Sequence, residues 1–349
     1  MNKDCLLSKL KGGLYGAAIG DSMGAITEHH SIPILRKIYP SLVDTFLEPY
    51  ELLKSRGHIK GMVTDDFSVG YYSLLAQLNK GERHISSQTA LEGLMHWNSI
   101  PQYARSAGPT TKVAIQKAKG EYVCVDTASG PVCDNSRVTN GGGMKAGIMG
   151  LLNPGDIDSA IDDAITLCAI THDNTIALSS ACAIAAATAG AFRNRASYVS
   201  VIQDGIYGAE EGLRRAGKIA LPVAGGNIAK KISLAVKIGL ECQDDDMDLA
   251  ISRIADIVGC GLYAYESIPA VFGFIAASRG EYMKSIVMAI NAGDDTDTVA
   301  CMLGYITGSL CSVHGIPVAY QELINTVNGF DLDQTAQEIE NLLLTGGRS

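Results

Sequence analysis

Apolar residues recur at spacings of three and four along most of this 349-residue chain, which is the period of an α-helix. The pattern is clearest at residues 6–18, 157–168, 299–310 and 332–343. Strand-like alternation is scarce, and Tyr122–Val125 is the only short candidate for a strand. The chain shows no repeat of about 30–45 residues and no Pro/Ser-rich linker. We therefore predict one compact all-α domain of many helices over residues 1–349, with its core at about 5–330.

An uncharged segment, residues 174–192, is almost long enough to span a bilayer. Ala, Ser and Thr dominate this segment, so we expect a helix packed in the centre of the protein instead.

The charge and cysteine patterns exclude several classes of protein. The net charge is −9, from 28 basic and 37 acidic residues, and no Lys/Arg block could grip nucleic acid. The nine cysteines are scattered and form no CxxC pair, which favours reduced thiols over disulfides or a zinc site. The N-terminus lacks the apolar segment of a signal peptide. We expect a cytoplasmic protein that binds neither nucleic acid nor a membrane.

Four glycines, Gly12, Gly16, Gly20 and Gly24, recur at a spacing of four and would line one face of the first helix and its exit. For Gly12 and Gly16 we expect close approach to another helix. Gly20 and Gly24 flank Asp21, in what we expect to be a turn near a ligand that leads to Glu28. Neither a dinucleotide-binding GxGxxG after a strand nor a GxxxxGK[ST] loop is present.

Two clusters of oxygen-bearing side chains each precede a predicted helix: Thr64-Asp65-Asp66, and residues 294–298 with the sequence Asp-Asp-Thr-Asp-Thr. Each cluster alone is compatible with ordinary helix capping. Three aspartates within four residues repel one another, however, and are more easily tolerated around a divalent cation. Carboxylates and hydroxyls without nearby His or Cys favour Mg²⁺ or Mn²⁺. The carboxylates of the two clusters suffice for two ions.

Six short motifs occur in an order that resembles the ADP-ribosylglycohydrolase family, which includes the dinitrogenase-reductase-activating glycohydrolases. The similarity runs from about Leu7 to Gly315 and is greatest to bacterial stand-alone members. The motifs are Gly12–Glu28, Thr64–Asp66, Val138–Met144, Thr171–His172, Glu266–Pro269 and Asp295–Thr298.

The resemblance implies an all-α fold with a binuclear Mg²⁺ or Mn²⁺ centre at the base of a cleft. The positions that match the family's metal ligands are Thr64, Asp65, Asp66, Asp295, Asp297 and Thr298. Glu28 matches a mobile acidic residue, and either Glu28 or an aspartate of the metal cluster (Asp65, Asp66) would be the catalytic acid or base. Asp294 stands where the family often has Gly and is left out of the ligand set. Phe67 replaces a frequent Thr.

Substrate-binding candidates lie in three further places. Asn140, Gly141 and Gly142 are expected to form a loop whose backbone amides receive an anion or a sugar, unless they form a plain turn. A lone histidine at the position of His172 is more often a helix-end residue than a catalyst, although the family places one near the ligand. Tyr265, with its neighbour Tyr263, would stack a base or simply pack. A helix starting at Pro109 is expected to border the cleft, and the other histidines are treated as incidental.

The implied reaction is hydrolysis at the anomeric carbon of a ribose, through a transition state like an oxocarbenium ion. The leading hypothesis is release of ADP-ribose from an ADP-ribosylated protein or small molecule. The alternative is a nucleoside-type N-ribohydrolase. A non-catalytic ADP-ribose-binding or structural member is a third hypothesis, against which the intact acidic clusters argue, because repelling carboxylates without metal are unfavourable.

Overall fold

The computed structural model describes residues 3–105, 107–121, 135, 137–244 and 246–346. Over these residues the regular elements are eighteen α-helices and two 3₁₀ turns, and the β-pairing consists of two isolated bridges. The prediction of an all-α fold is confirmed. The strand candidate Tyr122–Val125 lies outside the described residues.

The helices of the first half of the chain are α1 (Lys3–Gly24), α2 (Ile32–Ile38), α3 (Glu51–Ser55), α4 (Asp65–Lys80), α5 (Ser87–Asn98), α6 (Pro101–Ala104), α7 (Pro109–Ala118), the 3₁₀ turn η1 (Asn140–Gly142), α8 (Gly143–Leu152) and α9 (Ile157–Ala169). Those of the second half are α10 (Thr175–Gly190), α11 (Tyr198–Ala216), α12 (Ile228–Glu241), α13 (Met247–Ile257), α14 (Ala264–Ser278), α15 (Tyr282–Ile290), α16 (Thr296–Cys311), η2 (Val313–Gly315), α17 (Val318–Asn328) and α18 (Leu332–Thr345).

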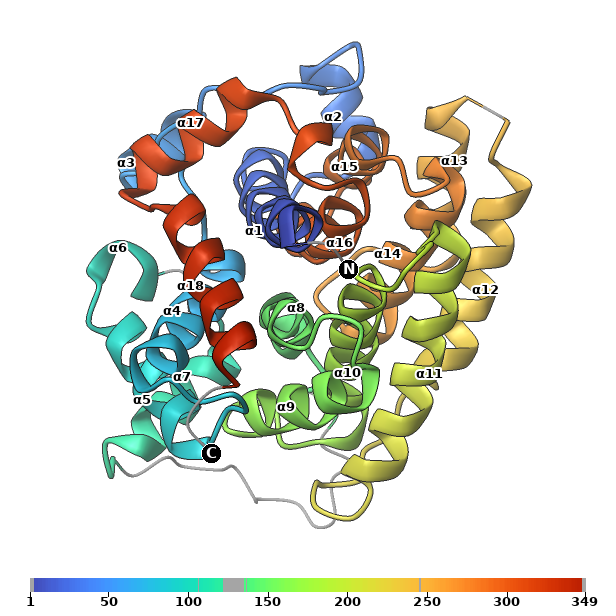
Figure 1. The fold of residues 1–349 in the computed structure, drawn as a ribbon. Helices are drawn as coiled ribbons and strands as arrows, with labels where there is room; N and C mark the ends of the chain where they lie inside the picture. The colour runs from blue at the N-terminus through green and yellow to red at the C-terminus, as the bar shows by residue number, and fades with distance from the viewer. Residues whose placement is uncertain (1–2, 106, 122–134, 136, 245, 347–349) are drawn as a thin grey trace.

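The helix α10 lies in the centre of the protein, packed against α8, α9 and α11 (Figure 1). All sixteen of its residues are buried, and most are Ala, Ser or Thr, whose small side chains let several helices surround it closely. The prediction of a packed central helix for this uncharged segment is therefore confirmed. None of the described helices combines the length and the apolar character needed to cross a bilayer.

The helices α1 and α16 are in backbone contact, although almost three hundred residues separate them in the sequence. A β-carbon on Gly16 would lie 2.5 Å from the Gly304 carbonyl oxygen, and one on Gly304 would lie 2.2 Å from that of Gly16. Atoms cannot approach so closely, so only glycine permits this contact. The expectation of close helix approach at Gly12 and Gly16 is confirmed.

For Gly20 and Gly24 the expectation of a turn is wrong. The helix α1 continues to Gly24, and Asp21 lies in its last helical turn. A β-carbon on Gly20 would lie 2.3 Å from the Ala300 carbonyl oxygen, and one on Gly24 would lie 2.5 Å from the Asp297 Cα. Both glycines therefore extend the contact with α16 instead of bending the chain.

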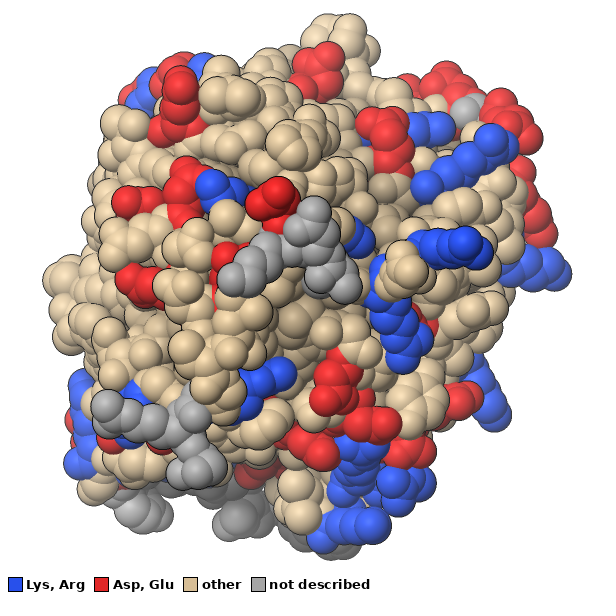
Figure 2. All heavy atoms as spheres, viewed as in Figure 1, with Lys and Arg blue, Asp and Glu red and all other residues tan. Residues whose placement is uncertain are grey.

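The distribution of charges on the surface and the state of the cysteines agree with the expectations from the sequence. Figure 2 shows acidic and basic side chains interspersed over one face of the molecule. Exposed ion pairs of this kind include Arg214 with Glu211 and Arg279 with Asp244. The seven described cysteines are free thiols, five of them buried, and Cys124 and Cys133 lie outside the described residues.

The α1–α16 contact generates a testable prediction. Gly304→Ala should destabilise the protein by about 2 kcal/mol or more, because overpacking a rigid contact between two backbones forces the helices apart. Urea unfolding followed by circular dichroism measures the change. Gly108→Ala is the matched control, because Gly108 has negative φ and open space around its Cα. Equal stability of the two variants would contradict the assignment of this contact.

Candidate active site

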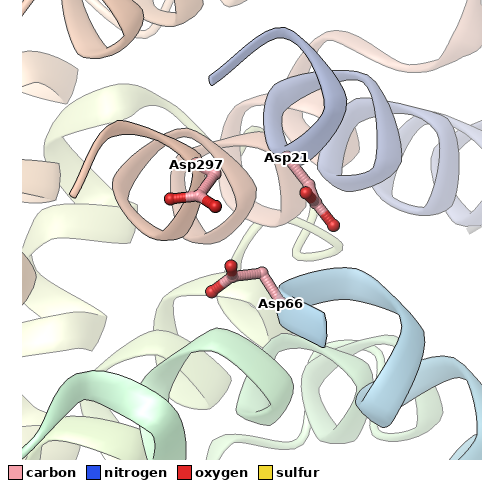
Figure 3. A group of neighbouring side chains, drawn as sticks. All are labelled: Asp21, Asp66 and Asp297. Atoms are coloured by element: carbon pink, nitrogen blue, oxygen red, sulfur yellow. The ribbon is translucent and has the colours of Figure 1, made fainter. Parts of the chain in front are cut away.

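Three helix ends meet in the interior of the protein, and each carries an aspartate. Asp21 lies in the last turn of α1, Asp66 in the first turn of α4 and Asp297 in the first turn of α16. Figure 3 shows their side chains projecting from three helices into the space between them. The three residues are buried, and one carboxylate oxygen of each lies within 4.8 Å of the other two.

A second group of carboxylates adjoins the first. Glu28, Asp295 and Asp297 also have oxygen atoms that all lie within 4.8 Å of one another. Asp297 is common to both groups, so the five residues form one continuous set, which we term the carboxylate cluster: Asp21, Glu28, Asp66, Asp295 and Asp297. Four of its members are buried, and Glu28 is partly exposed.

Asp21 is held by the backbone at the start of α4. Its carboxylate accepts hydrogen bonds from the Thr64 N–H at 3.0 and 3.1 Å and from the Phe67 N–H at 2.9 Å. Free N–H groups and the helix dipole make this helix end favourable for an anion. Phe67 contributes only its backbone here, because its ring packs against Tyr71 and Tyr305.

Asp21 is the site residue that the sequence analysis missed. A signal for it existed, because an acid in an otherwise small and apolar helical segment is unusual in a buried position. The expectation of a turn at Gly20–Gly24 concealed this signal.

Asp66 is oriented by two threonines from different helices. Thr64 donates to one of its carboxylate oxygens at 2.9 Å, and Thr298 donates to the other at 2.6 Å. Thr64 is also the N-cap of α4, since its hydroxyl oxygen accepts from the Asp66 N–H. The structure thus brings together Thr64, Asp66 and Thr298, three of the residues singled out in the sequence.

Asp65 and Asp294 lie at the edge of this arrangement. Asp65 is partly buried and belongs to neither of the two groups of converging oxygens. Asp294 is exposed and has a left-handed backbone, with φ of +64°. Its carbonyl accepts from the His29 N–H at 2.8 Å, and its N–H donates to the His30 carbonyl at 2.9 Å. These two bonds join the loop that carries Glu28 to the loop before Asp295.

The carboxylate cluster is electrostatically unfavourable by itself. Burial, with the charges of Asp295, Asp66 and Asp21 added, raises the pKa of Glu28 to about 8. Burial, with the charge of Asp295, raises the pKa of Asp66 to about 7. The pKa values of Asp21, Asp65 and Asp297 also lie well above the usual range, because burial and neighbouring carboxylates both disfavour ionisation.

Counter-charge for these carboxylates is scarce. Within the described residues, no Lys, Arg or His forms an ion pair with any of the four aspartates of the cluster. His29, one of the histidines expected to be incidental, is exposed, and its Nε2 lies 3.1 Å from Glu28 Oε1. Several buried carboxylates and hydroxyls without nitrogen or sulfur ligands form the donor set that suits hard divalent cations. The residues present therefore fit such ions.

Asn140 connects the cluster to the start of α8. Its side-chain amide donates to Asp295 at 2.6 Å, and its backbone N–H donates to the Leu262 carbonyl. Asn140–Gly142 form a 3₁₀ turn in which Asn140 and Gly142 are buried. Of the two alternatives left open by the sequence, the structure has a turn, which is held between the segment around Leu262 and the ring of His172. The expected binding role of its amides stays a prediction.

The remaining candidates differ in accessibility. His172 is buried, and both of its ring nitrogens are hydrogen-bonded to threonine hydroxyls. Tyr265 is partly exposed and stacks on Tyr263, with ring centroids 5.2 Å apart and planes at 6°. The Lys231 ammonium lies 5.2 Å from the Tyr265 ring centroid. Pro109 starts α7, as the sequence predicted.

Comparisons with known proteins agree with this fold. The sequence profile of the family described as ADP-ribosylglycohydrolase matches residues 2–347. The chain is 27% identical to the uncharacterized protein YegU of Escherichia coli (strain K12), over 94% of this chain and 95% of that protein. It is 23% identical to the ADP-ribosylhydrolase ARH3 of Mus musculus, over 96% of this chain and 92% of that one.

Among solved structures, one described as an ADP-ribosylglycohydrolase-related protein complex has the same fold. Its TM-score is 0.67 at 17% sequence identity, covering 97% of this chain and 99% of the other. With the family profile matching nearly every residue and an all-helical fold shared over the same length, the chain belongs to the ADP-ribosylglycohydrolase family.

Proposed function

We propose that this protein is a metal-dependent hydrolase that cleaves a ribosyl bond at the anomeric carbon and releases ADP-ribose from an ADP-ribosylated protein or small molecule. Family membership supports a glycohydrolase. The observation that carries the proposal is the carboxylate cluster, in which five acids from distant parts of the chain converge in the interior. Such a cluster is costly unless it serves to bind cations.

The proposed cofactor is a pair of Mg²⁺ or Mn²⁺ ions. Two overlapping groups of oxygens that share Asp297 support two ions. When bound, the ions would hold the ribose hydroxyls and activate a water molecule. The proposed ligands are those expected from the sequence: Asp66, Asp295 and Asp297 contribute oxygens to the two groups, whereas Thr64, Asp65 and Thr298 are proposed from the family resemblance alone. Asp21 accepts three backbone hydrogen bonds, so we assign it the role of fixing α4 against the cluster.

Proton transfer is assigned to Glu28. Among the five members of the cluster it alone is partly exposed, with 25% of its side chain accessible, so it can meet substrate and water. Asp66 is less suited, because each of its carboxylate oxygens already accepts a threonine hydroxyl. Glu28 would accept a proton from the attacking water or donate a proton to the leaving group.

Substrate binding is assigned to the turn at Asn140–Gly142 and to Tyr265. The turn lies beside Asp295 and begins a helix that has no side-chain cap, so N–H groups at this helix start can donate to polar groups of a ligand. Tyr265 and Tyr263 offer a partly exposed aromatic surface on which a base can stack. The positive charge of Lys231 beside them favours an ADP-ribosyl substrate over a nucleoside, since only the former carries a diphosphate.

Metal binding is tested by thermal unfolding. Millimolar Mn²⁺ or Mg²⁺ should raise the Tm of the chelator-treated protein, by the equivalent of about 2.7 kcal/mol at a hundred times Kd. Asp297→Asn should lose this response and all turnover while its helical circular dichroism persists. Asp256→Asn, at an exposed position on α13, is the control that should retain both. A wild-type Tm indifferent to both ions would refute the metal centre.

Glu28→Gln should lower kcat by a hundredfold or more, since general acid–base catalysis by a side chain typically contributes about 10²–10⁴. The amide keeps the shape of the side chain, and Glu28 is not among the proposed ligands, so the rise of Tm with Mn²⁺ should remain. Steady-state kinetics with saturating Mn²⁺ measure the loss. Unchanged kcat in this variant would remove Glu28 from the reaction.

The substrate class is tested by a product screen with mass spectrometry. The substrates are ADP-ribosyl-arginine, ADP-ribosyl-serine, O-acetyl-ADP-ribose and a panel of nucleosides. We expect free ADP-ribose from at least one ADP-ribosyl compound and intact nucleosides. Release of bases from nucleosides without release of ADP-ribose would favour the alternative, a nucleoside-type N-ribohydrolase.

A further inference from the structure

A lysine with no acidic partner among the described residues lies in the interior, behind the turn that carries Asn140. Lys145, on α8, is 2% exposed, and its ammonium donates to the Thr171 hydroxyl at 2.7 Å. Within the described residues, no carboxylate forms an ion pair with it. Burial lowers the pKa of this lysine. Keeping such a group away from water is unfavourable, so its contact with Thr171 requires an explanation.

The contact is the first link of a chain of buried side chains. The Thr171 hydroxyl lies 2.8 Å from His172 Nδ1, and His172 Nε2 lies 2.9 Å from the Thr139 hydroxyl. The other three residues of this hydrogen-bonded chain, Thr171, His172 and Thr139, are all at least nine-tenths buried. The chain therefore runs, without solvent, from the interior of α8 to the residue before Asn140.

The donor properties of lysine set the direction of this chain. An amine side chain in this position donates to Thr171, so the Thr171 oxygen accepts, and its own proton is left to donate. Two acceptors are near it: His172 Nδ1 at 2.8 Å and the Cys168 carbonyl at 3.3 Å. The shorter contact favours Nδ1, and positive charge on Lys145 also favours a lone pair on that side of the ring.

The same reasoning determines the protonation state of the other ring nitrogen, Nε2. Burial, together with the charge of Lys145, lowers the pKa of His172 to about 3, so the ring is neutral near pH 7 and carries one proton. With Nδ1 accepting, that proton is on Nε2 and is donated to Thr139.

The far end of the chain supports the proposed substrate-binding turn. Asn140, which follows Thr139, donates to Asp295 of the carboxylate cluster at 2.6 Å. The His172 ring lies directly under Gly141, where a β-carbon would be only 2.9 Å from Cε1 and Nε2. A rotation of the ring would therefore displace both ends of the turn.

We propose that Lys145 is a positioning residue that acts through Thr171 to hold His172 as its Nε2–H tautomer, and so fixes the turn at Thr139–Gly141 against Asp295. His172 then supports the substrate-binding turn from beneath, and its expected contact with substrate stays a prediction. The effect on turnover rests on the proposed function. The predicted tautomer of His172 does not rest on it. A failure of this proposal can therefore be distinguished from a failure of the proposed function.

The tautomer is measured by long-range ¹H–¹⁵N NMR of the histidine rings in the full-length protein near pH 7, with His172 assigned from the His172→Gln spectrum. We expect Nδ1 to give the signal of an unprotonated nitrogen and Nε2 that of a protonated one. Lys145→Met, which removes the donor but keeps the length of the side chain, should yield a mixture of the two tautomers. A wild-type Nδ1–H ring, or an unchanged ring in the variant, would overturn the proposal.

Activity and a matched pair of threonines complete the test. Thr171→Val should change the tautomer and lower kcat/KM about tenfold, as loss of a supporting hydrogen-bond partner typically does, while the Tm rise with Mn²⁺ persists. It also serves if Lys145→Met fails to fold. Thr188→Val is the control, because Thr188 is equally buried but its hydroxyl bonds only within α10. If Thr171→Val matches this control in tautomer and kinetics, the proposal is wrong.

The coupling of Lys145 to Thr171 is tested by combining their substitutions. If both act through one chain, the double variant Lys145→Met/Thr171→Val should lose no more activity than Thr171→Val alone. Additive losses in kcat/KM would show that Lys145 acts independently of Thr171 and would overturn the proposed route.

Discussion

The backbone contact between α1 and α16 is the constraint on which the rest of the structure depends. It spans Gly16, Gly20 and Gly24 on α1, and its last member lies directly against the Cα of Asp297. The register of two helices from opposite ends of the chain therefore sets the positions of Asp21 and Asp297 relative to one another. A side chain at this interface would separate the two helices and with them the carboxylates of Asp21 and Asp297. The packing of the helices therefore determines the geometry of the site.

The helix α4 completes the site through hydrogen bonds to the same acids that repel one another. Asp21 on α1 accepts from the first N–H groups of α4, and Thr298 on α16 donates to Asp66. The positive ends of α4 and α16 also face the cluster and offset part of its negative charge. Within the described residues, no Lys, Arg or His forms an ion pair with the four aspartates of the cluster, and this uncompensated charge supports the proposed binding of cations.

Much of the fold could be predicted from the sequence. The helical spacing of apolar residues and the composition of residues 174–192 both reflect which side chains are buried, and burial is what determines the helices and their packing. The pairing of Asp66 with Asp297 was also expected, though from a family resemblance and not from spacing. Asp21 was missed although its place in a small, apolar segment gave a signal for it. Two features were beyond this reasoning: the continuation of α1 through Gly24, and the packing of the turn at Asn140 against Leu262 and His172. Each depends on a contact between segments distant in the chain, and no local pattern records such a contact. The burial of His172 between two threonines belongs to the same class.

The left-handed backbone at Asp294 has a consequence for motion. Its two hydrogen bonds to His29 and His30 tie the main chain beside Glu28 to the loop that leads into Asp295. The segment around Glu28 therefore cannot open as an independent flap without breaking both bonds. Movement of the Glu28 carboxylate between the proposed cation and substrate would therefore take place by rotation about its own χ angles, without a rearrangement of the loop.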